Sequence, residues 1–152
     1  MSLLELPACR TGVDLVEVAT VASSIERFGD RYLHRVFTEQ ELASSGRRPE
    51  KRTASLAGRF AAKEATMKVL QVPGPGLDWR SIEVVREPTG ACHLRLTGRA
   101  QALAREAGLS GFAVSITHDA GLAMAVVMAV ATGPGPRSDD VPDCHCTRTG
   151  ET

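Results

Sequence analysis

Apolar residues recur at helical spacing in the middle of the chain, between residues 56 and 70. After Gly58 this segment contains no residue that breaks a helix, and the proline- and glycine-rich stretch 72–76 is suited to end one. The spacing predicts a long helix over residues 56–70, whose apolar face would be formed by Leu56, Phe60, Ala61, Ala65 and Val69.

The segment before this helix predicts a strand followed by short helices. Residues 11–18 read as the strand and lead into a helix that Gly29 interrupts. Thr38 and Glu41 have the spacing of a capping box, in which the hydroxyl and the carboxylate each accept a hydrogen bond from an orphan amide at a helix N-terminus. Residues 44–52 are polar and contain both glycine and proline, so a loop is predicted there.

The second half of the chain mixes strands with one helix, and no regular strand–helix–strand repeat is visible. The predicted fold class is therefore α+β. Strands are predicted over residues 82–86, 92–96, 112–117 and 122–130, a turn over 118–121, and a helix over 97–107 with Thr97 as its cap and Gly108 as its stop.

The last twenty-one residues differ from the rest, because they consist largely of small, polar and proline residues with little to bury. We expect one folded domain over residues 1–131 and a disordered tail over residues 132–152. The tail contains Cys144, His145 and Cys146, whose tight spacing and missing fourth ligand make a poor zinc site. We favour an exposed tail without metal.

The composition of the chain argues against several classes of protein. The chain has 152 residues, 43% of them hydrophobic, and its eighteen basic residues balance its eighteen acidic ones. A neutral chain without a basic stripe is not typical of a general nucleic-acid binder. The longest apolar run, residues 122–131, is too short to span a bilayer, and no secretory signal precedes the first strand. We expect a cytoplasmic protein with no membrane or nucleic-acid partner.

Three short segments carry candidate chemistry. Asp14 interrupts an apolar run, where a carboxylate is costly unless it is paired, binds a cation, faces water or caps the next helix. Glu64 and Lys68 share one face of the long helix, and Arg59 and Lys63 share a neighbouring face; a solvated face with an ordinary ion pair is the alternative interpretation. The third segment, residues 114–119, contains His118 at the end of the predicted strand, where a lone histidine is more often a turn residue than a catalyst.

The combination and order of these segments is more specific than any one of them. Gly12-Val13-Asp14, then Phe37-Thr38 with Glu41, then the run GRFAAKEA at residues 58–65 with Lys68, and finally VSITHD at residues 114–119 follow one another along the chain. In this order they closely resemble the holo-acyl-carrier-protein synthases, the short single-domain 4′-phosphopantetheinyl transferases. The resemblance covers roughly residues 9–131.

The resemblance implies a fold and a reaction. The family is α+β, with a long helix packed on a small antiparallel sheet, and its members are usually homotrimers with active sites between neighbouring subunits. They transfer 4′-phosphopantetheine from coenzyme A to a serine of an apo acyl carrier protein and release 3′,5′-bisphosphoadenosine. In that family the residues matching Asp14 and Glu64 hold Mg²⁺, which agrees with the preference of this ion for carboxylate and phosphate oxygens.

Further roles are implied residue by residue. Lys68 would act with Asp14 and Glu64 in catalysis by placing an ammonium group on the pyrophosphate, and Glu64 is the nearest candidate base for the serine. Cofactor contacts are implied for Arg59, Lys68, Gly74, Gly76 and His118. The chain departs from the family at residues 71–73, at Thr20, where many relatives carry a basic residue for carrier docking, and in the tail.

The carrier requires a basic surface, because carrier proteins are typically acidic around the modified serine. Arg27, Arg31 and Arg35 are the first candidates, although Gly29 can break the helix that would align them. The second candidates are Arg47, Arg48, Lys51 and Arg52. Whether the carrier serves fatty-acid or polyketide synthesis is left open by the residues, as is a rival hypothesis, a module that binds coenzyme A without turnover.

Overall fold

The computed structural model describes residues 9–72 and 76–131. The predicted tail, with its Cys144-His145-Cys146 segment, and Gly74 lie outside these residues. Five helices, one 3₁₀ turn and five strands follow in an α+β order, as predicted. The helices are α1 (Val18–Phe28), α2 (Asp30–Val36), α3 (Glu39–Ser44), α4 (Pro49–Leu70) and α5 (Gly98–Glu106), the turn is η1 (Trp79–Ser81), and the strands are β1 (Cys9–Glu17), β2 (Ile82–Arg86), β3 (Cys92–Leu96), β4 (Leu109–Asp119) and β5 (Leu122–Ala131).

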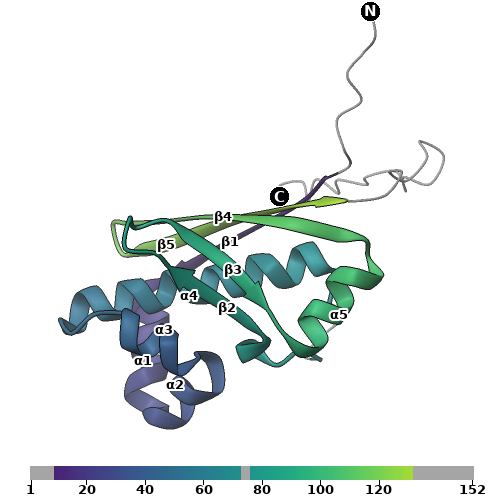
Figure 1. Ribbon diagram of the computed structural model, residues 1–152. Helices are drawn as coiled ribbons and strands as arrows, with labels where there is room; N and C mark the ends of the chain where they lie inside the picture. Colours follow the sequence, from purple (N-terminus) through teal and green to yellow (C-terminus); the bar gives the residue numbers. More distant parts are fainter. Residues whose placement is uncertain (1–8, 73–75, 132–152) are drawn as a thin grey trace, which may run out of the picture.

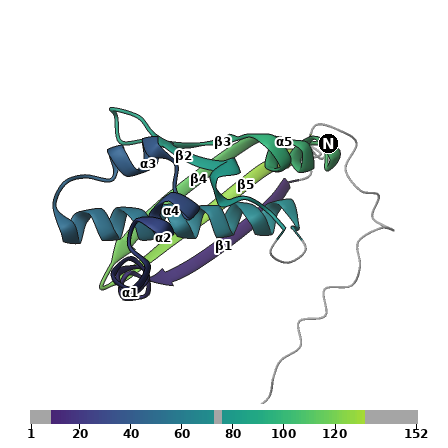
Figure 2. The same cartoon turned by 90° about the horizontal axis from the view of Figure 1, so that it is seen from below.

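A three-stranded antiparallel sheet with the order β1-β5-β4 supports the long helix α4, while β2 and β3 form a separate hairpin. Figures 1 and 2 show α4 crossing one face of the larger sheet, with α1, α2 and α3 gathered at one end of the helix and α5 at the other. The resemblance therefore predicted the architecture of the single chain correctly: a long helix packed on a small antiparallel sheet.

The strand β5 shows why one face of the sheet is covered and the other is open. Its alternate residues are fully buried small side chains that pack beneath α4, namely Ala123, Ala125, Val127 and Ala129. Gly12 of β1 brings the helix still closer, because a Cβ atom built there would lie 2.2 Å from the carbonyl oxygen of Ala65. Such close packing sets the distance between β1 and the middle of α4.

Two predicted boundaries differ from the structure. Residues 49–52 belong to α4 rather than to a loop, because Pro49 occupies the first turn of the helix, where a missing amide hydrogen is tolerated. The strand β4 extends to Asp119, so His118 lies in the strand, and the reversal is confined to Ala120 and Gly121, both with positive φ. The capping box of Thr38 and Glu41 is confirmed. Thr97 precedes α5, but its side chain makes no capping hydrogen bond.

Candidate active site

Asp14 lies on the covered face of β1, opposite α4. Its side chain is 18% exposed and accepts a hydrogen bond of 3.0 Å from Nζ of Lys68, which also donates to the carbonyl oxygen of Val13 at 2.7 Å. The lysine thus reaches from α4 to the strand instead of pairing with Glu64 on its own helix. Of the two interpretations of this helical face, the ordinary ion pair between residues 64 and 68 is wrong.

Glu64 lies one helical turn before Lys68 and is partly buried. Within the described part of the chain its carboxylate has no hydrogen-bond or ion-pair partner. Burial raises the pKa of Glu64, the nearby charge of Asp14 raises it further, and Lys68 opposes the shift. The site therefore holds two interacting carboxylates, one of them paired with an ammonium group and the other unpaired.

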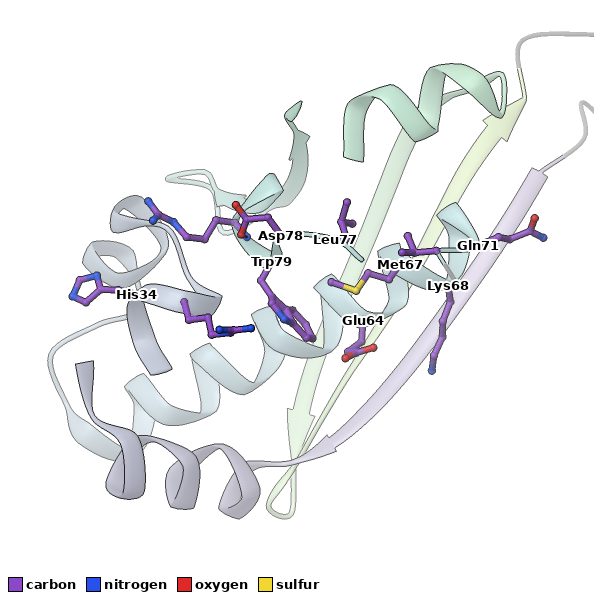
Figure 3. A pocket seen from close by; sticks show the side chains of 11 residues that line it. His34, Glu64, Met67, Lys68, Gln71, Leu77, Asp78 and Trp79 are labelled. Atoms are coloured by element: carbon purple, nitrogen blue, oxygen red, sulfur yellow. The ribbon is translucent and has the colours of Figure 1, made fainter. Parts of the chain in front are cut away.

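A cleft of about 840 Å³ opens beside these residues. Figure 3 shows Glu64, Met67 and Lys68 of α4, with Gln71 just after the helix, on one side, and Leu77, Asp78 and Trp79 on the other, with His34 from α2 at the far end. The complete lining is His34, Arg35, Glu64, Met67, Lys68, Gln71, Val72, Leu77, Asp78, Trp79 and Arg80. Cationic groups from three elements thus surround a cleft that also has apolar walls, a combination suited to a phosphorylated ligand with an apolar arm.

Several lining residues were missed from the sequence. Trp79 and Arg80 belong to η1, and nothing in their local sequence indicates that the chain returns there to α4. Arg35 was assigned to carrier docking, but it lines the cleft. The only sequence signal was that Trp79 is the single tryptophan of the chain and follows a proline- and glycine-rich loop.

Two predicted cofactor contacts lie elsewhere on the same chain. Arg59 is only 4% exposed and donates hydrogen bonds to Oγ of Ser44 at 3.0 Å and to the hydroxyl and carbonyl oxygens of Ser55. Burial lowers the pKa of its guanidinium, and the charge of Glu41 opposes that shift. His118 is exposed at the end of β4, where it pairs with Ala123. Neither residue lines the cleft, and Gly76, which is exposed, does not line it either.

The predicted docking arginines are divided between two helices. Gly29, with a φ of 55°, ends α1, so Arg27 lies on α1 while Arg31 and Arg35 lie on α2. The guanidinium of Arg27 lies 5.0 Å from the centre of the Phe28 ring, and that ring is 51% exposed. Arg27 and Phe28 therefore give this end of the molecule a surface that is both basic and apolar.

Two absences among the described residues bear on metal binding and on membranes. No group of three or more His, Cys, Asp or Glu side chains converges within residues 9–72 and 76–131, so the candidate metal site rests on the two carboxylates alone. In the same ranges, no helix is both long and apolar enough to cross a bilayer.

Comparison with known proteins identifies the class. Residues 10–127 match the model of the 4′-phosphopantetheinyl transferase superfamily. The chain is 46% identical over 125 residues to a holo-[acyl-carrier-protein] synthase of Methylobacterium nodulans, a match that covers 79% of this chain and 94% of the relative. A synthase of the same name from Streptomyces avermitilis is 45% identical over 119 residues, with 78% and 94% covered.

Solved structures of the same class share the fold. A Chronobacterium ammoniagenes ACPS–CoA complex superposes with a TM-score of 0.75 at 31% identity and covers 83% of this chain and 99% of that one. A Helicobacter pylori holo-[acyl-carrier-protein] synthase in complex with coenzyme A gives a TM-score of 0.68 at 31% identity, covering 78% and 98%. The chain therefore belongs to the 4′-phosphopantetheinyl transferase superfamily and, within it, to the holo-[acyl-carrier-protein] synthases. It is an enzyme of the phosphopantetheinyl transferase class.

Proposed function

We propose that this enzyme transfers 4′-phosphopantetheine from coenzyme A to a serine of an apo acyl carrier protein, in a magnesium-dependent reaction. The observation that carries the proposal is the cleft that Glu64 and Lys68 line together with further cationic side chains, with Asp14 just outside the lining and paired with Lys68. The serine oxygen attacks the phosphorus that carries pantetheine, the bridging P–O bond of the pyrophosphate breaks, and 3′,5′-bisphosphoadenosine leaves with the bond's electrons.

Asp14 and Glu64 are the proposed magnesium ligands. The unpaired carboxylate of Glu64 and the rise in its pKa caused partly by Asp14 both support this assignment, because a cation shared by the two groups would offset their repulsion. When bound, the ion would neutralise charge on the two phosphates. The residues present thus fit a hard divalent cation that completes its coordination with phosphate and water oxygens.

The remaining polar groups have distinct proposed tasks. Lys68, held over Asp14 and the Val13 carbonyl, orients an ammonium group toward the pyrophosphate. Glu64 is also the nearest candidate to accept the serine proton, directly or through water. Arg35 of α2 and Arg80 of η1 both line the cleft and are suited to bind phosphates of coenzyme A.

The direct test is to incubate the protein with coenzyme A, Mg²⁺ and an apo carrier, and then to weigh the carrier by mass spectrometry. We expect the carrier to gain one phosphopantetheine group per molecule, and none when a chelator is added. Binding of coenzyme A without any change in carrier mass would contradict the proposal and support the rival hypothesis, a binding module. A panel of fatty-acid and polyketide carriers would identify the preferred partner.

We further propose a homotrimer whose sites form between subunits. The open face of the β1-β5-β4 sheet supports this, because it exposes a contiguous set of large apolar side chains: Val13, Leu15, Leu122, Met124, Val126 and Met128. His118 supports it as well, since its exposed side chain lies away from the cleft of its own chain and could contact a cofactor in the cleft of a neighbouring copy. Arg59 is buried and gives no such support.

Carrier docking is proposed for the surface formed by Arg27, Phe28 and Arg31. The double substitution Arg27→Glu with Arg31→Glu should raise the KM for carrier about tenfold and leave the KM for coenzyme A nearly unchanged, because exposed charges act mainly on association. Added salt should likewise raise the KM of the wild-type enzyme for carrier, because salt screens interactions between exposed charges. Steady-state assays in which each substrate is varied in turn provide the measurement.

The matched control is Arg47→Glu with Arg48→Glu, which makes the same change in charge in the alternative docking segment. We expect that variant to change the carrier KM by less than about threefold. If the control raises the carrier KM and the first double variant does not, the docking surface lies at residues 47–52.

A further inference from the structure

Lys63 is a fully buried lysine next in sequence to Glu64. Its side chain is 0% exposed, although most other buried residues of α4 are apolar. The ammonium group donates hydrogen bonds to the carbonyl oxygens of Trp79, at 3.0 Å, and of Ile82. It also lies 5.9 Å from the centre of the Phe37 ring. A buried ammonium is costly, so such a set of partners requires an explanation.

Glu41 supplies the compensating charge. Its carboxylate lies 2.9 Å from Nζ of Lys63 and is likewise 0% exposed. The same carboxylate accepts the amide of Thr38 at 2.9 Å, as part of the capping box of α3, and the amide of Val84 at 3.0 Å. The pair thus joins α3, α4 and β2.

The segment bound by Lys63 is one wall of the cleft. Asp78, Trp79 and Arg80 all line the cleft opposite Glu64 and Lys68, as Figure 3 shows for the labelled residues. Next to this segment, the amide of Thr97, just before α5, donates a hydrogen bond to the carbonyl oxygen of Ser81. The Trp79 ring stacks on the Phe60 ring of α4, with 5.0 Å between the ring centres. Stacked rings can slide, whereas hydrogen bonds to two carbonyl groups fix both distance and direction.

We propose that Lys63 is a positioning residue: its ammonium group fixes the Trp79–Arg80 wall of the cleft relative to Glu64 and thereby sets the enzyme's affinity for coenzyme A. This role rests on the proposed function, because it assigns coenzyme A to the cleft. Lys63 itself touches neither substrate nor metal. It is buried against η1 and the start of β2, and it acts through the backbone carbonyls that it holds.

The test compares two variants that differ only at Lys63. Glu41→Gln leaves both carbonyl bonds of Lys63 in place but also leaves a buried ammonium without its counter-ion, so this variant should lose stability without losing the contacts to the wall. Glu41→Gln with Lys63→Met removes those bonds without leaving a buried unpaired charge, which a single Lys63→Met substitution would do. Leu109→Ala, a core substitution at the start of β4, is the control for lost stability alone.

Trp79 provides a readout that does not depend on turnover, because it is the only tryptophan of the chain. In the double variant we expect acrylamide to quench Trp79 about twofold more effectively and the KM for coenzyme A to rise about tenfold. The turnover number and the KM for carrier should change by less than about threefold. Glu41→Gln and Leu109→Ala should remain close to wild type in quenching and in the KM for coenzyme A.

Two results would overturn the proposal. One is a double variant that is folded by circular dichroism and matches Leu109→Ala in Trp79 quenching and in the KM for coenzyme A. The other is a double variant that does not fold, since Lys63 would then act on the whole fold rather than on one wall. An inactive wild-type enzyme would contradict the proposed function instead, and the quenching comparison would still report on the wall.

Discussion

Glu64→Gln and Asp14→Asn should each abolish phosphopantetheine transfer, with a loss on the order of 10³-fold or more in kcat/KM, because each removes one of the two carboxylates available to the metal. Both substitutions keep the shape of the side chain and change its charge, so the fold should persist. Mass spectrometry of the carrier measures the transfer, and chelation of the wild-type enzyme should give the same result.

The matched control is Glu50→Gln, the same change in the first turn of the same helix, far from the cleft. It should leave kcat/KM within about twofold of wild type. Activity near the wild-type level in Glu64→Gln or Asp14→Asn would exclude that side chain as an essential ligand.

Glu64→Gln should abolish transfer, but it should slightly increase the stability of the fold when metal is absent. The pKa of Glu64 is raised by burial and by Asp14, so the folded protein holds this proton to a higher pH than the unfolded chain does. Glu64 therefore contributes stability that is fully present below the pKa of an unfolded glutamate. This stability is lost as pH rises through the higher pKa of Glu64 in the folded protein. In chelator, the glutamine variant should melt slightly above wild type at neutral pH, and this difference should disappear below the ordinary glutamate pKa.

The sequence predicted the fold wherever local pattern and global packing agree. The apolar face of residues 56–70, the strand alternation of residues 122–130 and the capping box of Thr38 each reflect a periodicity or spacing that the structure retains. The beginning of α4 was missed because its first residues are polar and include Pro49. That proline reads as a breaker, although the first turn of a helix accepts it.

The candidate site was predictable only in part. Asp14, Glu64 and Lys68 came from a motif, and the structure brings them together at the edge of one cleft. The position of η1 opposite α4 depends on long-range packing, which no local pattern encodes. For Arg59 and Lys63 the spacing left a solvated face open as an alternative, yet both are buried. Glu41 and Ser44, from earlier in the chain, and Ser55, one turn away on the same helix, supply their partners.

The second large effect should follow from a charge on the open face of the sheet. Val126 lies on the central strand β5, is 39% exposed, and packs beneath no helix of its own chain. Val126→Glu should therefore keep the protomer folded but prevent association, because an apolar interface does not accept an unpaired carboxylate. Light scattering should show a monomer, and transfer should fall at least about a hundredfold if sites form between subunits.

The control for added charge is Thr89→Glu, in the exposed turn between β2 and β3. That variant should remain a trimer with activity close to wild type. A wild-type protein that is monomeric and fully active at assay dilution would contradict the proposed assembly, as would a monomeric Val126→Glu variant with full activity.

Mixing two inactive variants tests the shared site directly. Glu64→Gln lacks a metal ligand in its own cleft, and His118→Ala lacks the side chain that we propose to contact the cofactor in a neighbour's cleft. In a trimer formed at random from equal amounts, about a quarter of the sites would combine an intact Glu64 with an intact His118. Co-refolding the two variants should therefore restore about a quarter of wild-type transfer, whereas mixing them without subunit exchange should restore none. If co-refolded mixtures stay inactive while light scattering shows mixed trimers, each site is built within a single chain.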